Sequence, residues 1–275
     1  MNKNLIKIIG YYINLLSYFS PNYAAKLAIK LFSTPQKGRI QDEQVQYLNT
    51  AIQEDIVYEN ISIKTYCWKG KKDTVLLAHG WESNSYRWKD LIELLKSLDY
   101  TVIAIDAPGH GNSSGKLFNA LLYSECIHTV AKKFNANTII GHSVGGTSTI
   151  FSQYKKQLES VEKIITLGAP SDFVDIFDRY ETMMGYNKKV SKGMSQYVLK
   201  KYNHLPEYYS AANFSKEIDA KILVVHDKKD RIIPFTDGLK FKKNYEKVEF
   251  IATKGFGHGL KNDAVHNFVI DFLNA

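Results

Sequence analysis

The sequence of 275 residues predicts an α/β fold built on a parallel sheet that helices cover on both faces. Two observations indicate this class. Short apolar, β-branched segments, typical of buried strands, alternate with longer segments of helical periodicity. Glycine-rich loops follow these strands, at the sheet edge where ligands of parallel sheets bind. The length suits one large domain with an insertion, and no internal repeat is found.

Composition and charge restrict the kind of partner. The hydrophobic fraction is 44% and the charged fraction 23%, as in soluble globular proteins. Residues 1–40 hold six lysines and arginines and no acidic residue, so of the net charge of +8 only +2 remains for residues 41–275. A nucleic-acid partner is therefore not expected. Cys67 and Cys126 suggest no disulfide framework or metal site, which fits a cytoplasmic protein.

Residues 1–41 are expected to form an amphipathic helical N-terminal segment. Ser20 and Pro21 end a first helix and begin a second. Three interpretations stay open: helices packed on the domain surface, a peripheral membrane anchor, or a signal peptide. The signal peptide fits least, because polar residues interrupt the apolar run of the first helix. The apolar side of the first helix holds Leu5, Ile8, Ile9, Tyr12, Leu16 and Phe19, and its polar stripe holds Lys3, Lys7, Gly10, Asn14 and Ser17.

The rest of the chain is expected to be one α/β domain, residues 42–170 and 215–275, interrupted by a helical insertion over 171–214. A helix over 42–53 and a strand pair from Ile56 to Trp68 precede the strand–helix alternation. The expected strands that follow are 74–78, 101–105, 138–141, 163–167, 221–225 and 248–252. The expected helices between and after them are 86–98, 121–134, 146–156, 238–245 and 262–273.

A serine between two glycines marks one strand-to-helix turn. Ser143 lies in the segment Gly141-His142-Ser143-Val144-Gly145, directly after a short apolar strand. This is the pattern of a nucleophile elbow, in which a sharp turn forces the serine backbone into a strained conformation. The flanking glycines remove the side chains that would clash at such a turn. Ser143 is therefore the candidate nucleophile.

A serine hydroxyl needs a general base, and the base needs an orienting acid. His258 follows a strand between two glycines and is the candidate base. Asp230 follows the preceding strand and is the candidate acid. The chain order Ser143, Asp230, His258 is the one expected for this type of elbow. The alternatives that stay open are Asp227 and Asp172 for the acid and His266 for the base.

Backbone N–H groups are the expected donors to a developing oxyanion. One is the N–H of Val144, which follows the nucleophile at a helix N-terminus. The other is the N–H of Trp81, in the loop His79-Gly80-Trp81 after an earlier strand. His142 is expected to point away from the serine. Three further histidines in strand-end loops are expected to make structural hydrogen bonds: His79, His110 and His226.

Taken together, these motifs resemble the α/β-hydrolase fold family over roughly residues 55–275. The motifs that carry the resemblance are His79-Gly80-Trp81, Asp106–Gly111 with Ser113, Gly141–Gly145, His226–Asp230 with Pro234, and Gly257-His258. The family implies a mostly parallel sheet with a reversed second strand and a helical cap inserted after the sixth strand. Its dehalogenase and epoxide-hydrolase members carry aspartate at the elbow, so Ser143 points instead to acyl-enzyme chemistry. Its peroxidase and C–C hydrolase members also carry serine there.

The expected function is that of a serine hydrolase that cleaves a carboxylic ester or thioester of a relatively apolar small molecule. No metal or cofactor is expected. The aromatic and methionine content of residues 171–214 suggests an apolar acyl pocket, although the same residues suit the insertion's own core. An acyltransferase and a small-ligand binding protein stay open as alternatives. The expected location is cytoplasmic, with membrane association through the N-terminal helices left open.

Overall fold

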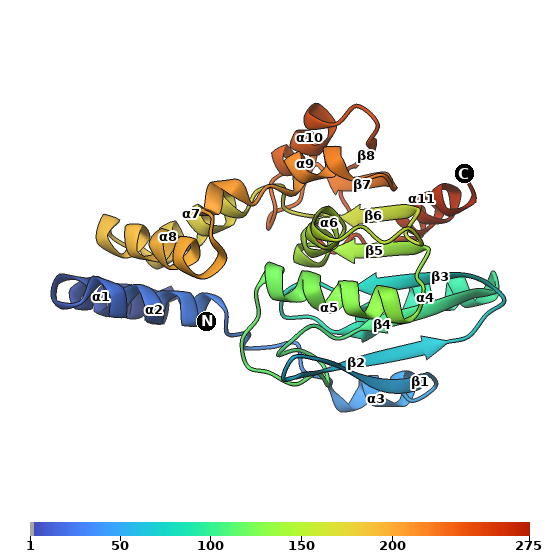
Figure 1. Ribbon diagram of the computed structural model, residues 1–275, viewed down its shortest axis with the longest axis horizontal. Helices are drawn as coiled ribbons and strands as arrows, with labels where there is room; N and C mark the ends of the chain where they lie inside the picture. Colours follow the sequence, from blue (N-terminus) through green and yellow to red (C-terminus); the bar gives the residue numbers. More distant parts are fainter. Residues whose placement is uncertain (1–2) are drawn as a thin grey trace. The chain divides into compact units, whose positions relative to one another are not determined.

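Eight strands form one sheet, and they alternate with helices as expected (Figure 1). The computed structural model describes residues 3–275. The strands are β1 Ile52–Tyr58, β2 Ile61–Trp68, β3 Lys72–Ala78, β4 Tyr100–Ile105, β5 Thr138–His142, β6 Lys163–Leu167, β7 Lys221–Asp227 and β8 Glu249–Thr253. The helices of the sheet-containing part are α3 Asp42–Leu48, α4 Lys89–Ser97, α5 Ala120–Lys133, α6 Val144–Lys155, α9 Ala211–Phe214, α10 Phe235–Asn244 and α11 Asp263–Asn274.

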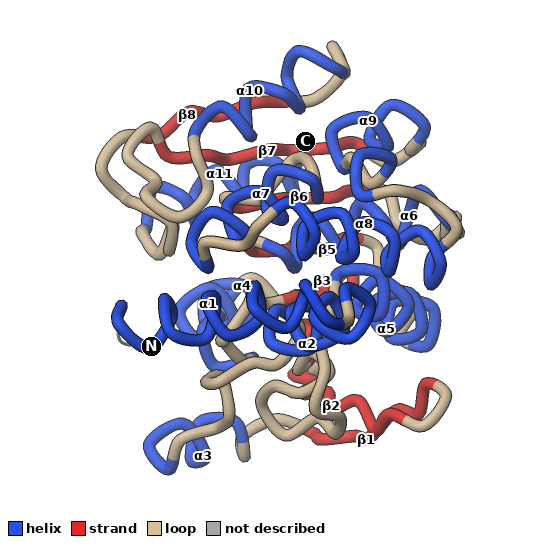
Figure 2. The backbone as a smooth tube through the Cα atoms, turned by 90° about the vertical axis from the view of Figure 1, so that its left-hand side faces the viewer, coloured by secondary structure: helices blue, strands red, loops and turns tan. Residues whose placement is uncertain are grey.

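The strand order confirms the predicted topology. It is β1-β2-β4-β3-β5-β6-β7-β8, and Figure 2 shows the sheet from β8 at the top to β1 at the bottom. β2 runs antiparallel to both β1 and β4, whereas the pairs from β4 to β8 are parallel. The second strand is therefore the reversed one, and the carboxyl ends of the six parallel strands lie at one edge of the sheet.

The largest difference between an expected and an observed element boundary lies just before the sheet. The helix expected over 42–53 ends at Leu48, because Ile52 already pairs with Cys67 in the ladder between β1 and β2. The strand pair therefore begins before the expected Ile56. Its turn lies at Glu59 and Asn60, as the sequence indicates.

Helices bury both faces of the sheet because its central strands are apolar on both sides. On one face α4 and α11 pack over the sheet through side chains such as Leu95 and Val269. On the other face α5 and α6 bury residues such as Ile127 and Ile150. Each such side chain contributes about 1.5–3 kcal/mol when it is fully buried. This core holds the strand ends, and with them the candidate site, in place.

The chain divides into two compact units. The larger unit, residues 35–171 and 211–275, contains the sheet. The smaller unit, residues 1–34 and 172–210, is called the helical unit below. Its helices are α1 Lys3–Phe19, α2 Pro21–Phe32, α7 Phe173–Met184 and α8 Lys188–Tyr202. The N-terminal segment and the insertion, which the sequence analysis treats separately, thus contribute to the same unit.

Candidate active site

Ser143 lies at a strained turn between β5 and α6. Its backbone angles are φ 54° and ψ −130°, a conformation that L-residues rarely adopt. The flanking glycines make the turn sterically possible. A Cβ on Gly141 would lie 2.5 Å from the Cα of Gly146, and a Cβ on Gly145 would overlap the carbonyl oxygen of Ala78. The turn projects the serine toward the sheet edge where the other strand-end loops meet.

The structure brings Ser143, His258 and Asp230 into one hydrogen-bonded chain. The Nε2 atom of His258 lies 3.0 Å from Ser143 Oγ, and its Nδ1 atom lies 2.7 Å from Asp230 Oδ2. The Asp230 side chain is fully buried, whereas 20% of the His258 side chain remains exposed. An Nδ1–H that donates to Asp230 leaves Nε2 with a free lone pair toward the serine hydroxyl.

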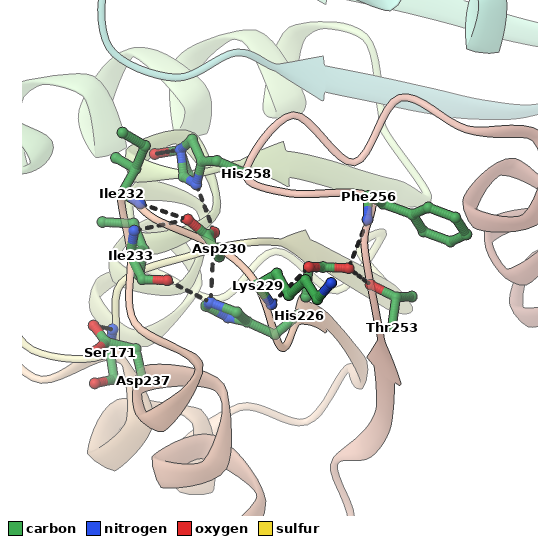
Figure 3. Close-up of polar contacts among 12 residues, drawn as sticks. Ser171, His226, Lys229, Asp230, Ile232, Ile233, Asp237, Thr253, Phe256 and His258 are labelled. Atoms are coloured by element: carbon green, nitrogen blue, oxygen red, sulfur yellow. Dashed lines mark hydrogen bonds and ion pairs between the residues drawn. The ribbon is translucent and has the colours of Figure 1, made fainter.

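Asp230 is held as a carboxylate by its surroundings (Figure 3). Burial by itself would raise the pKa of this carboxyl. Hydrogen bonds from His258 and from the backbone N–H groups of Ile233 and Ile232 outweigh that effect, and the pKa lies below its ordinary value. The two N–H groups donate to Oδ1 at 2.9 and 2.8 Å. His226 Nε2 donates to the carbonyl oxygen of Ile233 at 3.0 Å, which fixes the same turn.

Asp227, the alternative acid, is engaged in the neighbouring loop. Its carboxylate accepts hydrogen bonds from Thr253 Oγ1 at 2.8 Å and from the N–H groups of Lys229 and Phe256 at 2.8 and 2.9 Å (Figure 3). Burial opposes ionisation here too, but these hydrogen bonds, with one from Gly255, lower the pKa of Asp227 to about 2. Asp227 therefore braces the loop that leads to His258.

The other two alternatives belong to different elements. Asp172 precedes α7 and belongs to the helical unit. His266 lies on α11, where its Nδ1 atom is 4.0 Å from Asp263 Oδ1. Neither residue takes part in the hydrogen bonds that join Ser143, His258 and Asp230.

The loop that carries Trp81 runs directly against the nucleophile. A Cβ on Gly80 would lie 2.9 Å from Ser143 Cβ, so only glycine allows this approach. His79 secures the loop, since its Nδ1 donates to the carbonyl of Gly80 at 2.7 Å and its Nε2 accepts from the N–H of Ala107 at 2.9 Å. Trp81 is the residue after Gly80, so its backbone begins one residue from the point where the loop approaches Ser143.

The two candidate oxyanion donors flank the elbow from separate elements. The N–H of Val144 is the first of α6 and has no acceptor within its helix. The Trp81 ring is 37% exposed and packs on Phe118 and His110, with centroids 5.4 and 5.5 Å apart. His110 is also a loop residue, and its Nε2 accepts from the N–H of Glu82 at 3.0 Å.

Two side chains that the sequence analysis does not identify hold the loop of His258. The Nε2–H of His142 donates to the carbonyl oxygen of His258 at 2.8 Å, and the two rings lie 4.9 Å apart. Arg87 Nη2 donates to the carbonyl oxygen of Gly259 at 2.9 Å. No sequence signal reveals such contacts, because the acceptors are backbone carbonyls of a distant loop.

His142 stays neutral at this position. Burial, followed by the positive charges of Arg87 and of protonated His258, holds its pKa well below the ordinary value. Its Nδ1 atom is buried without a hydrogen-bond partner among residues 3–275. A neutral ring can therefore donate only through Nε2, and that donor is used on the backbone of His258.

Within the described part of the chain, no group of three or more histidine, cysteine, aspartate or glutamate side chains is arranged to hold a metal ion. The polar groups at the site are therefore the serine, the histidines, the aspartates and the backbone donors described above.

Comparison with known proteins finds a match to one family model and similarity to several hydrolases. The family model of the alpha/beta hydrolase fold matches residues 73–204. A serine hydrolase-like protein of Danio rerio is 38% identical over 112 residues, which cover 38% of this chain and 34% of that protein. The chain thus spans about a third of the length of this curated relative. An AB hydrolase superfamily protein of Bacillus subtilis is 21% identical over 73% of this chain and 91% of its own.

A solved structure extends the likeness over most of the chain. The alpha/beta hydrolase domain-containing protein 10 from mouse superposes with a TM-score of 0.63 at 18% identity, over 82% of this chain and 97% of that chain. At this identity the likeness concerns the fold, which agrees with the strand order and with the helical insertion after β6. The chain therefore has the α/β-hydrolase fold.

Proposed function

We propose that the protein is a serine hydrolase that cleaves a carboxylic ester or thioester through an acyl-enzyme intermediate. The single observation that carries the proposal is the chain of hydrogen bonds from Ser143 Oγ through His258 to Asp230, with the serine at a strained turn. The similarity to a serine hydrolase-like protein supports the same reaction class.

In the proposed mechanism His258 acts twice. Its Nε2 atom first accepts the proton of Ser143 Oγ as that oxygen attacks the carbonyl carbon, and the backbone N–H groups of Trp81 and Val144 bind the resulting oxyanion. His258 then gives this proton to the departing alcohol or thiol. A water molecule, deprotonated by His258, then attacks the acyl-enzyme, and His258 returns that proton to Ser143 Oγ as the acid leaves. Asp230 orients the imidazole throughout and stabilises its protonated form.

An apolar substrate is proposed from the surroundings of the elbow. The partly exposed Trp81 ring, backed by Phe118, offers an apolar wall one residue from the contact with Ser143. Two of the three methionines of the insertion are buried. Met184 and Met194 are buried in the core of the helical unit, and Met183 is exposed.

The test is labelling with a fluorophosphonate probe, which reacts with activated serines. We expect the wild-type protein and Ser97→Ala, which changes an exposed serine at the end of α4, to label equally, and Ser143→Ala not to label. The absence of wild-type labelling would contradict the proposal and would favour a binding protein with little turnover.

Product analysis then separates the remaining alternatives. p-Nitrophenyl esters of two to twelve carbons report the acyl preference, and thiol release from acyl thioesters reports thioesterase activity. A primary alcohol added to the reaction distinguishes transfer from hydrolysis. We expect free acid as the main product, and a predominant new ester would identify an acyltransferase.

A further inference from the structure

The first helix exposes its apolar side. In α1, seven large hydrophobic side chains have exposed fractions between 46% and 82%: Leu5, Ile8, Tyr11, Tyr12, Leu15, Tyr18 and Phe19. At about 100° per residue they lie on one continuous side of the helix. These seven residues are called the α1 face below. Single exposed hydrophobic residues are ordinary on protein surfaces, but a contiguous set of this size marks an interaction site.

The opposite side of α1 packs within the helical unit through Ile13, which is 1% exposed, and through polar residues that make hydrogen bonds. Asn14 Nδ2 donates to the carbonyl oxygen of Gly185 at 2.8 Å, and Asn14 Oδ1 accepts from the N–H of Asn187 at 2.8 Å. Asn187 Nδ2 donates to the hydroxyl of the fully buried Ser17 at 3.1 Å. At Gly10 the backbones of α1 and α7 are so close that a Cβ would overlap the carbonyl oxygen of Met184.

These contacts fix the rotation of α1 about its own axis. Turning the helix to hide the α1 face would break the hydrogen bonds of Asn14 and Ser17 and would move side chains into the space that Gly10 leaves. Breaking such bonds within a packed unit is unfavourable. The exposure of the α1 face is therefore a property of how the helical unit packs.

The charge around the α1 face favours an anionic partner. Residues 1–34 carry four lysines and no acidic residue, and the two segments of the helical unit together hold ten basic and five acidic side chains. Lys189 Nζ lies 4.2 Å from the centroid of the Tyr18 ring, so a cation borders the face. Lys7 on α1 is exposed beside it, as are Lys26 and Lys30 on α2.

The composition of the α1 face suits a lipid interface better than a second copy of the chain. Three of its seven side chains are tyrosines, whose apolar rings and polar hydroxyls suit the headgroup region. Two copies would bring two units of the same positive charge together, which disfavours self-association. No described helix is long and apolar enough to cross a bilayer.

We propose that α1 lies in the plane of an anionic membrane, with the α1 face in the acyl-chain boundary and the surrounding lysines at the lipid headgroups. Interfacial helices of this kind combine buried apolar area with attraction to anionic lipids. The contact would tether the protein peripherally. It does not depend on the chemistry proposed for Ser143.

Vesicle flotation of the full-length protein tests this proposal. We expect the wild-type protein to float with vesicles of phosphatidylcholine and phosphatidylglycerol, and to bind vesicles of phosphatidylcholine alone at least about tenfold more weakly. Ile8→Glu combined with Phe19→Glu, at two of the most exposed positions of the face, should weaken binding by about tenfold or more. Raising the salt concentration should weaken wild-type binding as well.

A matched control places the same two charges elsewhere. Ile52 and Val57 on β1 are 57% and 70% exposed, and Ile52→Glu with Val57→Glu should leave flotation unchanged. Unchanged melting temperatures would show that each variant is folded. The proposal is overturned if the wild-type protein does not float, or if the α1 variant floats as well as the control. A dimer in solution that the α1 variant dissociates, without vesicle binding, would instead assign the face to a second copy.

Discussion

His142 offers the sharpest test of how the catalytic loop is positioned. Its Nε2–H donates to the carbonyl oxygen of His258 at 2.8 Å, so the residue beside the nucleophile holds the backbone of the proposed base. Gln can present an N–H at nearly the same place as Nε2, whereas Asn presents its N–H nearer to the position of Nδ1. We therefore expect His142→Gln to keep the contact and His142→Asn to lose it.

The magnitude follows from the lost hydrogen bond. Leaving this partly buried carbonyl without its donor costs about 1–3 kcal/mol. Since about 1.4 kcal/mol corresponds to a factor of ten, kcat of His142→Asn should fall by about five- to a hundredfold. KM should change little, because His142 positions the base and does not bind the acyl group. Hydrolysis of a short p-nitrophenyl ester measures both constants.

The pH dependence supplies a second readout. Because the pKa of His142 lies well below its ordinary value, the ring is neutral over the working range and adds no charge beside His258. The pH profile of His142→Gln should therefore coincide with that of the wild-type protein. Equal activity of the Asn and Gln variants, or a displaced pH profile for Gln, would refute this account. Melting temperatures show whether a slow variant is simply unfolded.

Three further substitutions test the site. Asp230→Asn removes the charge that orients His258 and should lower kcat by about 10³–10⁴-fold, measured with the same ester. Asp227→Asn should lower the melting temperature at pH 7. Because the pKa of Asp227 is lowered to about 2, its carboxylate stabilises the fold above about pH 4 and loses that effect as the pH falls through about 2, so melting curves of the wild-type and Asn proteins should converge in acid. Gly80→Ala places a Cβ 2.9 Å from Ser143 Cβ, so the loop must shift, and kcat should fall by about a hundredfold. A wild-type kcat in this variant would argue against Trp81 as an oxyanion donor.

The sequence predicts the parallel sheet and the meeting of Ser143, Asp230 and His258, because both depend on regular features. Strands that are apolar throughout belong to a sheet covered on both faces, and loops after parallel strands gather at one edge. The glycines that flank Ser143 are needed because a side chain at either position would clash, and they can be read directly from the sequence. Asp227 and Asp230 are harder to distinguish, because one ends β7, the other follows it by three residues, and only the fold shows which carboxylate faces His258.

What the sequence does not predict are contacts whose partners carry no sequence signature. Arg87 and His142 hold carbonyl oxygens of Gly259 and His258, and any residue could supply those oxygens. Local spacing cannot reveal such pairs. They become visible only when the loop after β8 is placed next to the elbow.

The orientation of α1 is a second feature that the sequence does not predict. Helical spacing shows that one side of α1 is apolar and the other polar, but it does not say which side is buried. An apolar side usually faces a core. The side that the helical unit buries carries both kinds of residue: Ile13 is 1% exposed, and Asn14 and Ser17 make hydrogen bonds with Asn187, more than 150 residues away in the sequence. With that side packed inside the helical unit, the α1 face is left for a different environment, and the lysines around it make an anionic lipid surface the environment that fits.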